Sequence, residues 1–257
     1  MYTKQYTLTP AAGKRLIAKA MLKINEIVEA LYNRTIVIVA GTTNGYIAEE
    51  MLSYISQAEG FSKQRFFRGI TLPPRYKVHQ SGRLEDGGTF TGDVVIQKGK
   101  WLKDKTLFEI VNDLQEGDII LKGANAVNCE TKQAAVLIGH PQAGTIGVIM
   151  QAVAGRRVKL YIPVGLEKRI SGNINELAQI INSPQSSGVR YFPVTGIIIT
   201  EIEAINILTG AQAHLFAAGG VSGAEGSVWI AVTGTEEQLK QADEIIKEIR
   251  QEPNFIV

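Results

Sequence analysis

The amino-acid sequence predicts an α/β fold, a parallel sheet covered by helices, with a small C-terminal α+β domain. Short β-branched runs alternate with segments of helical periodicity, which is typical of βαβ units. The pattern changes after SPQSSG at 183–188, where small, polar and proline residues indicate a linker. We therefore expect one domain over residues 1–188 and a second over 189–257.

The first elements predict the start of the parallel sheet. Residues 10–32 carry apolar side chains at helical spacing, with Pro10 in the first turn. The apolar strand Thr35–Val39 follows, then the glycine turn AGTTNG at 40–45, then a second helical pattern over Tyr46–Ile55. A buried strand, a glycine turn and a helix in this order open a βαβ unit.

The middle of the chain adds an insertion and further strands. Glycine and polar residues predict a β-ribbon insertion near 75–103, with turns at Asp86-Gly87-Gly88 and Lys98-Gly99. Later apolar runs predict strands over 118–121, 134–138 and 158–164, and helices over 105–114 and 148–154.

Beyond residue 188 the expected order is β-α-β-β-α, which predicts a small ferredoxin-like α+β domain. Its expected elements are strands at 196–200, 213–218 and 227–233 and helices at 201–208 and 235–250. Thr235 is a suitable cap for the last helix, and its apolar residues from Leu239 to Ile249 form one stripe.

Composition limits the classes of function. The 257 residues are 45% hydrophobic and 20% charged, with a formal net charge of only +2, so neither a nucleic acid nor a membrane surface is the expected partner. The single cysteine, Cys129, excludes an intramolecular disulfide and fits a reducing compartment. MYTKQYTLTP has no apolar segment of the kind found in signal peptides, and we expect a cytoplasmic location without a membrane span.

Two turns are candidate binding sites. Gly41-Thr42-Thr43-Asn44-Gly45 would aim backbone N–H groups and a positive helix end at a phosphate or carboxylate. The alternative is a turn whose threonine only caps the helix, and the local sequence does not separate the two. In Lys122-Gly123-Ala124-Asn125, at the end of a predicted strand, Lys122 could neutralise an anion and Asn125 could orient a hydroxyl or carbonyl. The alternative there is a surface turn with a solvated lysine.

These motifs resemble, in order from about residue 35 to 233, those of the ribose-5-phosphate isomerases. GTTNG at 41–45 stands where that family has a Gly-Thr-Gly-Ser-Thr phosphate loop, and KGANAVN at 122–128 where it has Asp-Gly-Ala-Asp-Glu-Val-Asp. IGHPQAG at 138–144 is the counterpart of its glycine loop, and YIPVGLEKR places Lys168 near the family lysine. AAGGVSGAEGSVWIAV at 217–232 resembles a late strand-turn-strand.

The resemblance is to a superfamily that also contains glucosamine-phosphate deaminases and coenzyme A transferases. It implies a Rossmann-like parallel sheet and a phosphate-binding cleft. The residues that it implies for that cleft are Gly41, Thr42, Thr43, Asn44, Lys122, Gly123, Asn125, Gln142, Gly144, Thr145 and Lys168.

The departures from the family concern its acids. Lys122 and Asn125 stand where the isomerases have catalytic carboxylates, and the segment Thr145–Gln151 after the glycine loop contains no acid. An amide is no base near neutral pH, and a lost general base typically costs about 10²–10⁴-fold in rate. Ordinary ribose-5-phosphate isomerase activity is therefore not expected, whereas backbone N–H groups that bind an anion would not depend on these acids.

Two reactive residues remain. Glu225 resembles, through Glu225-Gly226 alone, the nucleophilic glutamate of coenzyme A transferases, although a solvated turn glutamate is the simpler interpretation. His140, in the glycine loop, is the candidate proton carrier, and neither His79 nor His214 lies near it in sequence. No spacing of His, Cys, Asp or Glu indicates a metal.

The first hypothesis is a binding protein or divergent enzyme that recognises a small phosphorylated or otherwise anionic metabolite. Acyl transfer from coenzyme A with Glu225 as nucleophile is the second, and coenzyme A is the one cofactor considered. A non-catalytic scaffold is the third. We expect a homo-oligomer in each case, because open α/β folds with an added α+β domain often self-associate.

Overall fold

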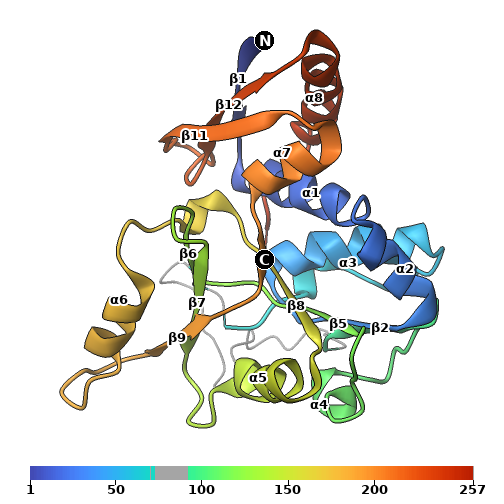
Figure 1. Ribbon diagram of the computed structural model, residues 1–257, viewed down its shortest axis with the longest axis vertical. Helices are drawn as coiled ribbons and strands as arrows, with labels where there is room; N and C mark the ends of the chain where they lie inside the picture. The colour runs from blue at the N-terminus through green and yellow to red at the C-terminus, as the bar shows by residue number, and fades with distance from the viewer. Residues whose placement is uncertain (70, 73–91, 257) are drawn as a thin grey trace.

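A six-stranded, mostly parallel sheet lies at the centre of the computed structural model, which describes residues 1–69, 71–72 and 92–256 (Figure 1). Strands β10, β8, β5 and β2 run parallel, and the sheet continues through two antiparallel pairs, β3 with β2 and β4 with β3. In this order along the sheet, the strands are β10 (Ile197–Ile199), β8 (Lys159–Pro163), β5 (Ile119–Leu121), β2 (Thr35–Ile38), β3 (Val94–Gln97) and β4 (Lys100–Trp101).

The sheet is buried on both faces because its strands are apolar on both sides. In β2, Ile36 and Ile38 belong to one core and Val37 to the other, as the period of two along a strand requires. The first core contains residues of α1 (Pro10–Met21), α2 (Asn25–Asn33) and α3 (Thr42–Tyr54). The second contains residues of α4 (Leu107–Ile110) and α5 (Gly144–Arg156). The helices therefore form a layer on each side of the sheet (Figure 1).

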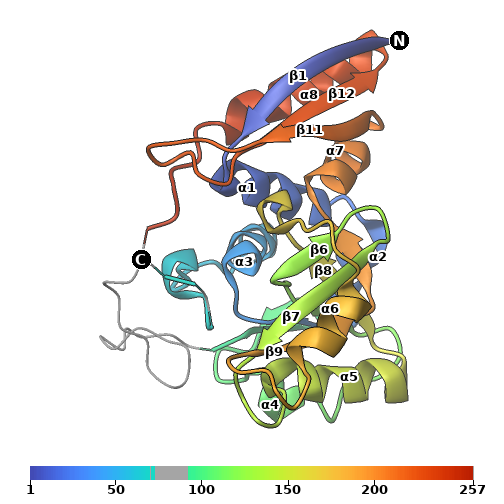
Figure 2. The same cartoon turned by 90° about the vertical axis from the view of Figure 1, so that its left-hand side faces the viewer.

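Two smaller antiparallel sheets flank this centre. One has the strand order β6 (Ala126–Asn128), β7 (Gln133–Ile138), β9 (Arg190–Val194), and α6 (Ile174–Ile181) packs beside it. The other has the order β1 (Tyr2–Leu8), β12 (Val228–Gly234), β11 (Gln212–Ala218), with α7 (Glu201–Thr209) and α8 (Glu236–Ile249) against it. Figure 2 shows the second sheet above the rest of the molecule, with α1 beneath it.

The sheets do not divide at residue 188, where the sequence predicts a domain boundary. Strand β1, from the start of the chain, pairs with β12 over its whole length, so the small sheet joins residues from both sides of that boundary. Conversely, β9 and β10 follow residue 188 and pair with β7 and β8. The linker composition of SPQSSG marks the connection between α6 and β9 and not the end of a sheet.

Several predicted elements are confirmed. The strands at 118–121, 134–138 and 158–164 correspond to β5, β7 and β8, and Thr235 caps α8 by accepting a hydrogen bond from the N–H of Gln238. The single helix predicted over 10–32 is instead two, α1 and α2, because the chain leaves the helical conformation after Met21. The turn at Lys98-Gly99 joins β3 to β4, but β3 is a strand of the central sheet, not part of an inserted ribbon. The turn predicted at Asp86-Gly87-Gly88 lies outside the described residues.

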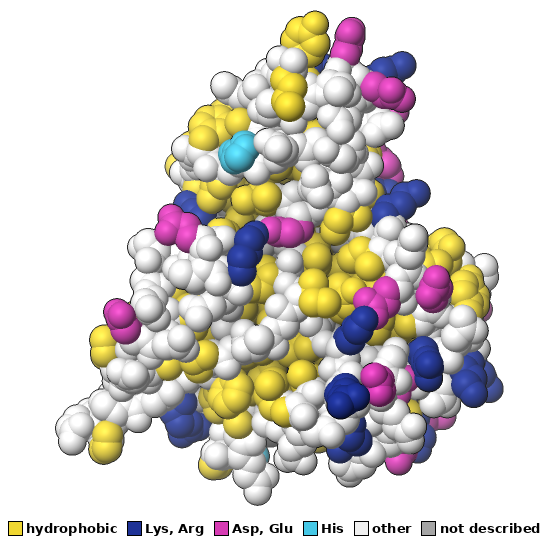
Figure 3. Space-filling model, viewed as in Figure 1, with side chains coloured by type: hydrophobic (Ala, Val, Ile, Leu, Met, Phe, Trp, Pro, Cys, Tyr) yellow, Lys and Arg dark blue, Asp and Glu magenta, His cyan; other side chains and the backbone are white. Residues whose placement is uncertain are grey.

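The surface is mixed in charge. On the face shown in Figure 3, Lys and Arg side chains lie among Asp and Glu side chains, most clearly at the lower right. Every helix in the described part of the chain is too short or too polar to cross a lipid bilayer.

Candidate functional site

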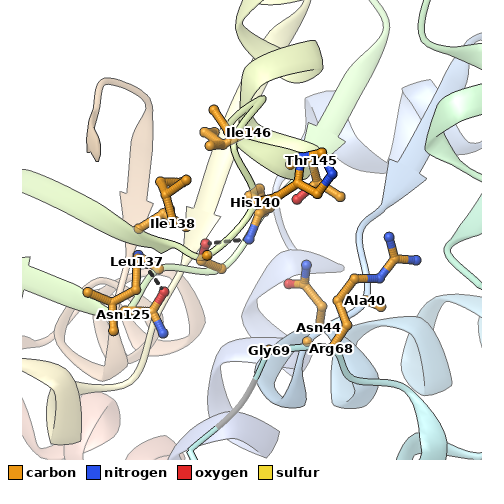
Figure 4. Close-up of a pocket in the computed structure, with 18 of the residues that line it drawn as sticks. Ala40, Asn44, Arg68, Gly69, Asn125, Leu137, Ile138, His140, Thr145 and Ile146 are labelled. Atoms are coloured by element: carbon orange, nitrogen blue, oxygen red, sulfur yellow. Dashed lines mark hydrogen bonds between the residues drawn. The ribbon is translucent and has the colours of Figure 1, made fainter. Parts of the chain in front are cut away.

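A pocket of about 670 Å³ lies at the carboxyl ends of the parallel strands. Residues 40–44 follow β2, residues 122–125 follow β5, and Lys168 lies in the 3₁₀ turn η2 (Leu166–Lys168) after β8. The remaining wall comes mainly from the end of β7, the loop after it and the start of α5. Open α/β sheets bind their ligands at this end, and the volume is in the range of small-molecule sites. Figure 4 shows part of the lining, with His140 and Thr145 on one side and Asn44 and Arg68 on the other.

The amino end of α3 forms one wall of the pocket. The helix begins directly after Gly41, which has an extended backbone, and no side chain caps its first turn. The predicted alternative, a threonine that caps this helix, is therefore not what the structure has. The N–H groups of a first turn have no partner within the helix, and no acidic residue lies in this turn. Thr43 lines the pocket, and its buried Oγ1 has no hydrogen-bond partner in the described structure.

Asn44 has a different role from the predicted one. Its side-chain Nδ2 donates to the carbonyl of Val39 at 2.7 Å and to that of Leu121 at 2.9 Å. Both N–H bonds of the amide are therefore used, and only the acceptor Oδ1 is left, which does not favour an anion. The prediction that this side chain holds an anion is corrected accordingly: Asn44 joins the ends of β2 and β5, and only its backbone N–H can serve a ligand.

The amino end of α5 forms the opposite wall. Ala143 and Gly144 both have left-handed backbones, with φ of 59° and 55°, before the helix proceeds through Thr145 and Ile146. A left-handed alanine costs about 1–2 kcal/mol, so this turn is held by its surroundings. As in α3, no side chain caps the first turn and no acid lies within it. Gly144 and Thr145, both predicted site residues, line the pocket.

Three cationic side chains line the pocket, and the described lining contains no Asp or Glu. Lys122 and Lys168 are predicted site residues, whereas Arg68 was missed because it lies in a segment without a motif. Arg68 Nη2 is 3.5 Å from Oδ1 of Asp93, whose buried carboxylate also accepts the N–H groups of Ala40 at 2.8 Å and Leu107 at 3.0 Å. Asp93 therefore anchors the arginine and the end of β2 from behind the pocket.

Burial lowers the pKa of both lysines. Burial, followed by the charge of Lys168, lowers the pKa of Lys122 to about 8. The charge of Asp93 opposes this shift, and the charge of Arg68 adds a smaller lowering effect. Burial is also the main reason why the pKa of Lys168 is lowered. The ammonium of Lys122 donates to the carbonyl of Gly123 at 3.4 Å. In the described structure neither lysine has a carboxylate within salt-bridge distance.

The other predicted residues divide into two groups. Gly41, Thr42, Gly123, Asn125 and His140 line the pocket. Asn125 Oδ1 accepts the N–H of Leu137 at 3.0 Å, and Nδ1 of the exposed His140 accepts that of Gln142 at 3.2 Å.

Gln142 and Glu225 are not brought to the pocket. Gln142 is exposed in the loop before α5. Glu225 lies in the exposed turn between β11 and β12, where Oε2 accepts the N–H of Gly223 at 2.8 Å. Hydrogen bonds from backbone N–H groups, its own first, lower the pKa of this carboxyl. Glu225 is thus an exposed, hydrogen-bonded turn residue, which agrees with the simpler of the two interpretations and not with a nucleophile in the pocket.

A second cluster of charges lies next to Lys168 and was not predicted. Glu201, at the start of α7, is 1% exposed, and its Oε2 accepts the N–H of Leu166 at 2.8 Å. Lys14 Nζ is 3.4 Å from Oε1 of Glu167. Burial, followed by the charge of Glu167, raises the pKa of Glu201 to about 8. This cluster joins α1, η2 and α7 and lies outside the pocket lining.

No group of three or more His, Cys, Asp and Glu side chains in the described residues is arranged to hold a metal ion. The chain was compared with known proteins, and no family model, curated protein or solved structure matched it. The functional argument therefore rests on the pocket itself.

Proposed function

We propose that the protein binds a small phosphorylated or otherwise anionic metabolite in this pocket, on a Rossmann-like sheet of the ribose-5-phosphate isomerase type. One observation carries the proposal: two helix amino ends and three cationic side chains meet around one cavity whose described lining has no acid. Each amino end is equivalent to roughly half a positive charge, and its free N–H groups suit phosphate or carboxylate oxygens.

The contrast with other helices supports the same conclusion. Helices α1, α6, α7 and α8 begin with a threonine or asparagine whose side chain accepts from their first turns. Such a cap satisfies one of the N–H groups that an anion would otherwise bind. Helices α3 and α5, which point their first turns into the pocket, lack both the cap and the acidic residue.

The proposed function does not include ordinary ribose-5-phosphate isomerisation. That reaction needs a base to move a proton between adjacent carbons, and the described lining supplies no carboxylate. Asn125, at one position of the missing acids, uses Oδ1 to accept the N–H of Leu137. Glu225 lies outside the pocket, so no observation favours the coenzyme A alternative.

The test is a thermal-shift and calorimetric titration with inorganic phosphate, glycerol 3-phosphate and sugar phosphates. A ligand at 100 times its Kd stabilises the fold by about 2.7 kcal/mol, which raises Tm by a few degrees. Lys168→Gln should weaken phosphate binding at least tenfold, whereas Lys240→Gln on the exposed side of α8 should leave it unchanged. No response to any of these phosphates, nor to small carboxylates titrated in the same way, would refute the proposal and favour the scaffold hypothesis.

A further inference from the structure

Lys122 is held at the pocket by its backbone and has no anionic partner among the residues that the structure describes. It is the first residue after β5, and its backbone N–H donates to the carbonyl of Tyr161 on β8 at 3.0 Å. The main chain on which the side chain is mounted is thus part of the sheet. Within the described part of the chain, its Nζ donates one hydrogen bond, a long one of 3.4 Å to the carbonyl of Gly123.

The groups around Lys122 disfavour its charged form. Arg68 and Lys168 line the same pocket from the segments after η1 (Lys63–Arg65) and β8, and both repel an ammonium. Asp93 attracts it, but its carboxylate is already shared among two backbone N–H groups and Arg68. The remaining titratable group of the described lining is His140, at the exposed loop before α5.

A lysine in such surroundings is chemically different from a surface lysine. With a pKa of about 8, about a quarter of Lys122 is the neutral amine at pH 7.5, against roughly 0.1% for a lysine with an ordinary pKa. Desolvation together with a neighbouring cation is a known way to make a lysine nucleophilic. The same pocket has two helix amino ends and two further cationic side chains that can bind an anionic substituent of a ligand. The described lining contains no carboxylate that would form an ion pair with Lys122.

We propose that Lys122 is a nucleophile that forms an imine with the carbonyl group of an anionic aldehyde or ketone bound in this pocket. The inference rests on the proposed function for the anionic part of the ligand and adds the carbonyl part. The phosphate or carboxylate of the ligand binds at the helix amino ends and Lys168, and its carbonyl carbon faces Nζ of Lys122.

The step balances without an oxidant or a second substrate. The lone pair of the neutral amine attacks the carbonyl carbon, the C–N bond forms, and the π electrons move to oxygen. The nitrogen loses a proton and the oxygen gains one, which gives a carbinolamine. A second proton reaches the hydroxyl group, water leaves, and the nitrogen lone pair completes the C=N bond. A protonated imine withdraws electrons from the adjacent carbon, so it activates the carbonyl group of the ligand without a carboxylate of the described lining.

Reductive trapping tests the proposal. The full chain is incubated at pH 7.5 with glycolaldehyde phosphate and sodium cyanoborohydride, and intact-mass and peptide-mapping spectra locate the adduct. We expect one adduct per chain, on Lys122, formed at least tenfold faster than on any other lysine. Its rate should rise with pH to half its maximum near pH 8. Lys122→Arg, which keeps the charge and removes the nucleophile, should abolish it, whereas Lys240→Arg should not.

The competing outcomes are distinct. Adducts spread over many lysines, or an unchanged adduct yield in Lys122→Arg, would overturn the imine proposal. If the variant misfolds, peptide mapping of the adduct on the unsubstituted protein still shows whether Lys122 is the modified residue. If glycerol 3-phosphate stabilises the protein but glycolaldehyde phosphate gives no adduct at Lys122, the imine fails and the anion site stands. If neutral glycolaldehyde labels Lys122 as fast as its phosphate and no phosphate ester stabilises the fold, the nucleophile stands and the proposed function fails.

Discussion

The side chain of Asn44, in the first turn of α3, donates a hydrogen bond of 2.9 Å to the carbonyl of Leu121, the last residue of β5. Its other N–H bond goes to Val39, directly after β2. One buried amide thus fixes the amino end of α3 against β2 and β5, the two strands whose following loops line the pocket. The geometry of the pocket depends on a residue whose side chain does not itself bind the ligand.

Replacing Asn44 should therefore act on stability first. Asn44→Ala leaves the carbonyl of Val39 without this donor inside the protein, which costs about 1–3 kcal/mol of unfolding free energy. Urea unfolding measures the loss. Asn175→Ala, at an exposed position of α6, is the control and should change the unfolding free energy by less than about 0.5 kcal/mol. Equal effects of the two substitutions would contradict the role given to Asn44.

Replacing Thr43 should not lower the unfolding free energy, in contrast to replacing Asn44. Its Oγ1 is buried and has no hydrogen-bond partner among the described residues, so Thr43→Val removes an unsatisfied polar atom and should leave the unfolding free energy unchanged or raise it by about 1 kcal/mol. The same substitution should weaken phosphate binding, because the hydroxyl is a donor at the first turn of α3. Calorimetry of the variant beside its urea curve checks both. Loss of stability with unchanged affinity would show that the hydroxyl serves the fold alone.

Two helical glycines should respond differently to alanine. A Cβ at Gly13 of α1 would lie 2.3 Å from Oε1 of Glu201, a buried carboxylate that is already held by the N–H of Leu166. Gly155, in α5, has nothing within 4 Å of that position. Alanine normally stabilises a helix interior by about 0.5–1 kcal/mol relative to glycine. We expect that gain for Gly155→Ala and a loss for Gly13→Ala, measured by thermal unfolding.

The carboxyl of Glu201 makes stability depend on pH. Its pKa is about 8 in the folded protein and near the ordinary value in the unfolded chain, so the folded state binds more protons between these values. Its contribution to stability is present at low pH and is lost as pH rises from about 4.5 to 8.

Glu201→Gln removes this titration and keeps an acceptor for Leu166. The variant should gain unfolding free energy relative to the original protein as pH rises through that window, by a few kcal/mol at most. Urea unfolding at a series of pH values measures the difference. Glu130→Gln, at an exposed position, is the control, and a constant offset for Glu201→Gln would refute the linkage.

The pattern of apolar residues predicted those helices and strands whose own sequence determines their conformation. Apolar runs such as Ile119–Leu121 and the stripe of α8 are strands and helices as expected. Strand β1 was not predicted because YTKQYTL has too few apolar residues, and it becomes a strand only through its pairing with β12. The apolar strand β3 differs in that only its partner was predicted wrongly: the sequence assigned it to a ribbon and the structure pairs it with β2.

The residues of the site likewise divide into those that local sequence predicts and those that only the fold brings together. The turns after β2 and β5 were found because glycine and polar residues follow apolar strands, and both line the pocket. Arg68 has no such signal in its neighbourhood, and Glu167 and Glu201 meet only because β8 and β10 are adjacent in the sheet. Glu225 was proposed from a motif of two residues, which says nothing of its distance from the pocket.

The pairing of β1 with β12 has a consequence for biosynthesis. Tyr2 lies opposite Gly234 and Leu8 opposite Val228, so β1 leaves the ribosome more than 200 residues before β12, and its hydrogen bonds form only after β12 has been made. At about 5–20 residues per second, that delay is on the order of tens of seconds. During that time the edge of β1 is open to other chains, and the polar and charged residues of YTKQYTL are those that discourage pairing with the wrong partner.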